Sequence, residues 1–202
     1  MRDPLELSSS TRRVLLRRGL TLEYLTLAWN VVGAAVVIAA ALAAGSVALA
    51  GFGLDSLIEI AASVVVVWQL NDPADGRERH ALRLIGGAFI ALAIYIASQA
   101  TYTLITANHP RSSTLGIIWT AATVAVMLAL AAGKARTGKA LKNPVLQTEG
   151  RVTLIDAYLA AAVLLGLVLN ATAHWWWADP LASLVIVYYG LREGRQALTH
   201  SR

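Results

Sequence analysis

Long apolar stretches, separated by short polar segments, restrict this chain more than any other feature of its sequence. Each stretch has about 20 residues or more, enough for an α-helix to cross the roughly 30 Å hydrocarbon core of a bilayer. The five prolines lie outside the stretches or in their first turns, where helices tolerate them. The sequence therefore predicts an all-α membrane protein with six transmembrane helices, at about 20–44, 46–70, 82–106, 114–133, 146–170 and 176–197.

The composition excludes several other classes of protein. The chain is 57% hydrophobic and only 14% charged, which does not suit a soluble domain. It has no cysteine, so it can form neither a disulfide nor a thiolate metal site. We find no nucleophile–base pair, no phosphate-binding glycine loop and no metal-hydrolase spacing. We therefore expect neither an enzyme nor a prosthetic group.

The basic residues predict the topology. Sixteen of the seventeen Lys and Arg residues lie in the N-terminal segment, in the 71–83 and 134–151 regions or at the C-terminal end, and the opposite face holds only Arg111. By the positive-inside rule, both termini are cytoplasmic in a multi-pass protein of a bacterial-type inner (plasma) membrane. The net charge of +5 thus reflects membrane topology and not a nucleic-acid partner. The expected organisation is a basic cytoplasmic segment 1–19, a six-helix domain 20–197 and a short cytoplasmic tail 198–202, with no soluble domain and no cleaved signal peptide.

Two carboxylates interrupt the second apolar stretch. Asp55 and Glu59 are four residues apart, so on a helix they lie on the same face, one turn apart. An acid at this depth costs a few kcal/mol on insertion scales, and two neighbouring acids also repel each other. Residues 46–70 contain no base. A bound metal cation or shared protons would stabilise the pair, whereas polar contacts with other helices or a water-filled crevice are the structural alternative.

A third acid has a matching depth. Glu59 lies ten residues before Gln69, and Asp156 lies ten residues after Leu146. Both are therefore about 15 Å from the cytoplasmic edge on helices that run in opposite directions. We expect Glu59 and Asp156 to face each other near the midplane, with Asp55 one turn further out. A hydrogen-bonded buried acid is the alternative for Asp156.

Other polar residues lie along the same route. Glu149, two turns before Asp156, would stand at the inner mouth, either as a further metal ligand or as a helix-start acid favoured by the helix dipole. We predict no Lys or Arg deep in the spans, and an interior lined by acids alone favours cations. The candidates for a secondary polar or proton path are Glu23, Asn30, Thr153 and Asp179.

These features together resemble the cation diffusion facilitator family. The residues that carry the resemblance are SVALAGFGLDSLIE, at 46–59, and the acid of the fifth span. In that family the second span supplies D-x-x-x-D or H-x-x-x-D to the transport site, and the fifth supplies H-x-x-x-D. The resemblance implies that Asp55, Glu59 and Asp156 are metal ligands. It also implies a homodimer, and the small residues Gly86, Gly87 and Ala91 would allow close contact between spans.

The sequence also departs from the family pattern. Val152 stands where the fifth span would have its histidine, and Glu59 is one carbon longer than the usual Asp. We expect no C-terminal cytoplasmic domain of the kind that typical members have, so the resemblance is to a short branch. Zinc favours imidazole or thiolate ligands, whereas carboxylates suit harder divalent ions such as manganese or magnesium. The departures therefore leave the preferred metal open.

The expected function is export of a divalent metal (zinc, manganese, iron, cobalt or cadmium) from the cytoplasm by proton antiport. The metal ion would be the substrate, and protons and the lipid bilayer would be the other partners. One alternative is an organic-cation exporter, in which Glu23 and aromatic side chains form a cage. Another alternative is a membrane metal-binding sensor or adaptor that does not transport.

Overall fold

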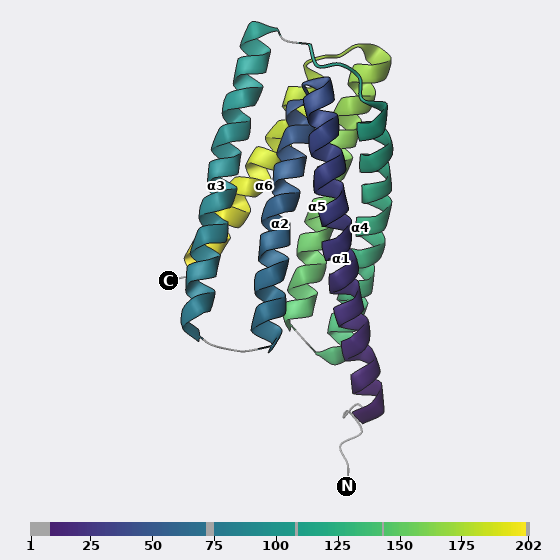
Figure 1. The fold of residues 1–202 in the computed structure, drawn as a ribbon, viewed down its shortest axis with the longest axis vertical. Coiled ribbons are helices and arrows are strands. Elements are labelled where there is room, and N and C mark those ends of the chain that lie inside the picture. The colour runs from purple at the N-terminus through teal and green to yellow at the C-terminus, as the bar shows by residue number, and fades with distance from the viewer. Residues whose placement is uncertain (1–8, 72–74, 108, 143, 201–202) are drawn as a thin grey trace.

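The computed structural model describes residues 9–71, 75–107, 109–142 and 144–200. These residues form α-helices and contain no β-strand, which confirms the predicted all-α class. The six helices are α1 (Ser9–Ala44), α2 (Val47–Asn71), α3 (Asp75–Thr106), α4 (Thr114–Leu141), α5 (Pro144–Ala173) and α6 (Ala178–His200) (Figure 1).

Several helices extend beyond the apolar stretches. α1 begins at Ser9, α3 begins at Asp75, and α4 continues to Leu141. Most of the residues expected between the second and third spans, and between the fourth and fifth spans, are therefore helical. The reason is that Ala, Leu, Lys and Arg are good helix formers, so a helix does not end where its apolar residues end. Residues 1–8 and 201–202, at the two expected cytoplasmic ends, lie outside the described residues.

Four of the helices qualify as membrane-crossing by length and composition within the described part of the chain. Their apolar segments are Ser10–Ala44, Gly86–Thr106, Thr114–Leu141 and Glu149–Ala173.

The helices form an elongated bundle (Figure 1). α1, α3 and α5 begin at the lower end in this view, and α2 and α4 finish there. The most extensive contacts join α4 to α5 and α3 to α6, whereas α2 contacts α1, α3, α5 and α6. α2 and α5 are therefore central elements, and their side chains can meet inside the bundle.

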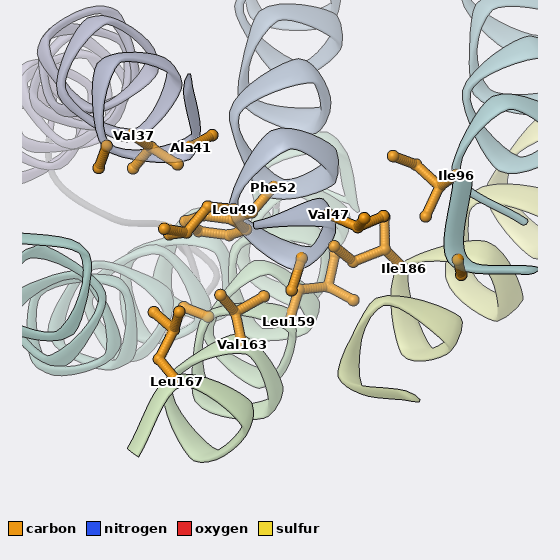
Figure 2. Packing of buried hydrophobic residues seen from close by; sticks show 14 of the residues in the cluster. Val37, Ala41, Val47, Leu49, Phe52, Ile96, Leu159, Val163, Leu167 and Ile186 are labelled. Carbon is orange, nitrogen blue, oxygen red and sulfur yellow. The ribbon is translucent and has the colours of Figure 1, made fainter. Parts of the chain in front are cut away.

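The apolar core lies in the upper half of the bundle. It is built around Leu49 and Phe52 of α2, which are 0% and 2% exposed. Fully burying a side chain of this size contributes about 1.5–3 kcal/mol. Phe52 is three residues before Asp55, so the packed core closes the bundle directly above that acid. Figure 2 shows the surrounding residues: Val37 and Ala41 from α1, Ile96 from α3, Leu159, Val163 and Leu167 from α5, and Ile186 from α6.

Small residues bring α3 and α6 together within the chain. A Cβ atom added at Gly86 would lie 2.9 Å from the carbonyl oxygen of Gly194. Gly86 therefore packs against α6 of the same chain. The expectation that it allows contact with a second copy was wrong. Gly87 is different, because a Cβ atom there would meet open space.

Candidate metal site

Three carboxylates meet at the centre of the bundle. Asp55 and Glu59 come from α2 and Asp156 comes from α5, and one ligand oxygen of each lies within 4.8 Å of the others. Two oxygens on opposite sides of an ion at 2.0–2.6 Å are about 4–5 Å apart, so a single cation can contact all three. We call these residues the carboxylate set. Asp55 and Asp156 are 3% and 1% exposed, and Glu59 is partly buried.

The backbone explains why these three residues meet. Glu59 is the central residue of α2, and Asp55 lies one turn above it on the same face. Asp156 lies near the middle of α5, which contacts α2. The structure therefore has the depth match that the sequence predicted. Whether the set binds a metal stays a prediction.

Asn30 of α1 holds one member of the set. Its side-chain Nδ2 donates a hydrogen bond of 3.0 Å to Oε2 of Glu59. Asn30 is 3% exposed, so this bond is inside the bundle. α1 approaches α2 closely nearby, because a Cβ atom added at Gly53 would lie 2.8 Å from the side chain of Ile38. The bond restrains Glu59 and leaves its other oxygen for a different partner.

Asp156 is the most deeply buried acid of the set. Both of its carboxylate oxygens are buried and accept no hydrogen bond within the described residues. A buried carboxylate is costly unless it is protonated, paired or bound to a cation. The alternative of a buried acid stabilised by hydrogen bonds therefore finds no donor in the described part of the chain. Thr153 does not supply one, because its hydroxyl donates to the Glu149 carbonyl oxygen at 2.9 Å.

A buried lysine overturns one prediction. Lys134 of α4 is 0% exposed, and its Nζ lies 2.9 Å from Oε2 of Glu23 and 3.9 Å from Oε2 of Glu149. The expectation of an interior lined by acids alone was wrong, because α4 continues past Gly133, beyond the expected fourth span, and carries Lys134 into the bundle. We call Glu23, Lys134 and Glu149 the Lys134 triad. Glu149 faces this lysine and is not a member of the carboxylate set.

The Lys134 triad also bears on the alternative function. An aromatic cage for an organic cation requires Glu23 as its free carboxylate. Glu23 is instead bonded to Lys134 and is 5% exposed. The lysine could have been suspected from the sequence, because a buried acid such as Glu23 needs a partner and Lys134 is the first base after the fourth apolar stretch.

Asp179 lies at the upper end of the bundle, away from the carboxylate set. Its carboxylate accepts hydrogen bonds from the hydroxyl of Ser46 and from the backbone N–H groups of Val47, at 3.0 Å, and Ala48, at 3.3 Å. These are the first N–H groups of α2, which have no partner within the helix. Asp179 of α6 therefore caps α2, and its place in a polar path stays a prediction.

Comparison with known proteins finds a family match and several relatives, among them a cation-efflux pump. Residues 24–201 match the family described as the cation efflux transmembrane domain. Transmembrane protein 163 of Xenopus laevis is 27% identical over 153 residues, covering 70% of this chain and 54% of that protein. An uncharacterized transporter of Synechocystis sp. is 26% identical over 165 residues, covering 76% of this chain and 53% of that protein. The cation-efflux pump FieF of Shewanella oneidensis is 31% identical over 106 residues, covering 52% of this chain and 34% of that protein.

The chain thus spans about half the length of the first two relatives, and the family match covers all six helices at least in part. The match includes Asp55, Glu59 and Asp156 within its bounds. Together with the apolar helices, it shows that this integral membrane protein belongs to the cation efflux family, the cation diffusion facilitators.

Proposed function

We propose that this chain transports divalent metal cations out of the cytoplasm, with the metal bound by the carboxylate set and exchanged for protons. The observation that carries the proposal is the convergence of Asp55, Glu59 and Asp156 within 4.8 Å at the centre of the bundle. Membership of the cation efflux family and the likeness to a cation-efflux pump support the same substrate class.

The ligand atoms favour a divalent cation. Three oxygen ligands suit ions such as manganese, and cobalt, iron, zinc and cadmium remain candidates for the same set. Val152 is partly buried one turn before Asp156 on α5 and offers the ion no nitrogen. The substrate metal therefore has to be identified by measurement.

Charge balance gives the reason for proton exchange. Three carboxylates this close repel one another, so they stay ionised together only while a cation compensates them. When the metal leaves, protons would replace it. The apolar core around Phe52 closes the route above the set in this conformation, so release on that side requires the helices to move.

The proposal includes the membrane topology. The lower end of the bundle in Figure 1 would face the cytoplasm, with six crossings and both termini on that side of a bacterial-type plasma membrane. The stacked pair Trp175 and Trp177, with ring centroids 5.1 Å apart, would then lie at the outer interface. We also propose a homodimer, formed through faces of the spans other than the Gly86 face.

The experiment that tests the function is uptake into proteoliposomes that contain a pH-sensitive dye. Manganese, zinc, iron, cobalt and cadmium would be supplied in turn to the wild type, to Asp55→Asn and to Asp156→Asn. The matched control is Tyr158→Phe, which alters an exposed side chain of α5 two residues from Asp156. We expect saturable flux of at least one metal with opposite proton movement, lost in both acid variants and kept in the control.

Other outcomes separate the alternatives. Stoichiometric metal binding without flux would replace the proposal with a sensor or adaptor. Uptake of quaternary amines that survives chelators, with no metal flux, would replace it with organic-cation export. Metal flux that is unchanged in Asp55→Asn and Asp156→Asn would show that the carboxylate set is not the transport site.

A further inference from the structure

The polar residues inside the bundle lie at two levels with the same spacing. On α1, Glu23 precedes Asn30 by seven residues, and on α5, Glu149 precedes Asp156 by seven residues. Seven residues are two helical turns, so each pair lies on one face. Both helices begin at the lower end of the bundle (Figure 1). The Lys134 triad therefore lies about 10 Å below the carboxylate set.

The lower level already holds a cation. The ammonium group of Lys134 contacts two carboxylates from two other helices, at 2.9 Å and 3.9 Å. The lysine side chain is 0% exposed, and those of Glu23 and Glu149 are 6% and 19% exposed. The other oxygen of Glu23, Oε1, is buried and accepts no hydrogen bond within the described residues. One carboxylate oxygen thus remains available at this level.

With both acids ionised, the three groups at the lower level would carry one negative charge that is not compensated. A single ammonium group compensates one ionised carboxylate, whereas a divalent ion in the same place would compensate both. The lysine backbone cannot easily move away, because α4 and α5 are in close contact at Gly150, where an added Cβ atom would lie 3.3 Å from Cβ of Lys134. The lysine stem has four flexible carbons, so its charged end can move while the backbone stays in place.

We propose that Glu23 and Glu149 form a second divalent-cation site, which Lys134 occupies in this conformation as a tethered cation. Metal moving between the cytoplasm and the carboxylate set displaces the ammonium group, which returns once the metal has passed. This inference rests on the proposed function for the identity of the ion and for the side from which it arrives. The inference adds a second binding site to the path of the metal, and at this site Lys134 competes with the metal ion.

The first test counts bound ions in purified protein. Mn²⁺ binding would be followed through the electron paramagnetic resonance signal of the free ion, with Zn²⁺ counted in parallel by equilibrium dialysis. We expect one ion per chain in the wild type and two in Lys134→Met, because removal of the ammonium group vacates the lower site. Lys134→Arg, which keeps the charge, should bind one ion. The double variant Lys134→Met/Glu23→Gln should also bind one, because it retains a single acid there.

The second test remains decisive if Lys134→Met fails to fold. Lys134→Met/Glu23→Gln loses one charge of each sign, so its cluster has the net charge of the wild type. Metal would be supplied to the side that bears the N-terminus, located by protease treatment of an N-terminal tag. We expect kcat/KM for metal to rise by about tenfold, because the metal no longer has to break a charge-assisted hydrogen bond on its way to the carboxylate set. If the ion pair were purely structural, its removal in the double variant would instead lower stability or kcat.

The outcomes distinguish this inference from the proposed function. If the wild type binds and transports neither metal, the proposed function fails. If the wild type does transport, but Lys134→Met binds one ion, or fails to fold while the double variant keeps the wild-type kcat/KM, then Lys134 is a structural partner only and the second site is refuted. Two ions in Lys134→Met would support the site, and, where that variant fails to fold, a raised kcat/KM of the double variant would support Lys134 as a competitor of the metal on the route.

Discussion

Replacing Asn30 with leucine tests whether the carboxylate set depends on its hydrogen-bonded neighbour. Asn30→Leu keeps the approximate volume of the side chain but removes the 3.0 Å bond to Oε2 of Glu59. A hydrogen bond to a charged group contributes about 1.5–3 kcal/mol, which corresponds to roughly a 10- to 150-fold change in an equilibrium constant. Loss of a group that orients a metal ligand typically weakens metal binding about 10- to 100-fold. We therefore expect the metal Kd of Asn30→Leu to rise about 10- to 100-fold.

The assay is calorimetric titration of the purified protein with the metal that the wild type transports. The control is Trp29→Phe, which removes the neighbouring 3.2 Å hydrogen bond from the indole Nε1 of α1 to the Thr123 hydroxyl and leaves Glu59 untouched. Its Kd should stay close to that of the wild type. A metal Kd of Asn30→Leu within about threefold of the wild-type value would fall well short of the expected rise. It would show that the hydrogen bond does not position Glu59 for the ion.

Three further predictions follow from named contacts. Asp179→Ala leaves the first N–H groups of α2 and the Ser46 hydroxyl without their acceptor, so the free energy of unfolding should fall by about 2–4 kcal/mol; an unchanged melting temperature in detergent would contradict this. Val152→His adds an imidazole one turn from Asp156 and should raise the zinc-to-manganese ratio of initial uptake rates, measured in competition. Gly166→Ala places a Cβ atom 2.7 Å from Cβ of Ala182 and 3.0 Å from the carbonyl oxygen of Ala178, so it should lower the melting temperature, and Ala182→Gly in the same chain should restore part of the loss.

The helices and most of the carboxylate set were accessible from the sequence for simple reasons. The length of each apolar stretch predicts a helix, whatever its partners are. The four-residue spacing of Asp55 and Glu59 places them on one face, and equal depth relates Glu59 to Asp156 across two antiparallel helices. These arguments need only helical geometry and a membrane of known thickness.

Contacts between distant residues were not accessible in this way. Lys134 and Glu23 are 111 residues apart, and nothing local shows that α4 continues far enough to bury the lysine. The capping bond of Asp179 likewise depends on α6, which places this residue against the start of α2, 132 residues away in the sequence. Glu149 likewise matched Asp156 in helical phase, but its contact with Lys134 depends on the packing of α4 against α5. Each of these contacts depends on tertiary packing, which the spacing of residues within one helix does not reveal.

The position of Asp179 also affects the electrostatic potential that a departing ion would meet. The residue caps α2 and lies in the first turn of α6, so it is close to the N-terminal ends of two helices. Each such end carries about half a positive elementary charge from the aligned peptide dipoles. An ionised carboxylate at this position would offset both, so under the proposed export a divalent cation leaving by this end of the bundle would not meet uncompensated helix dipoles.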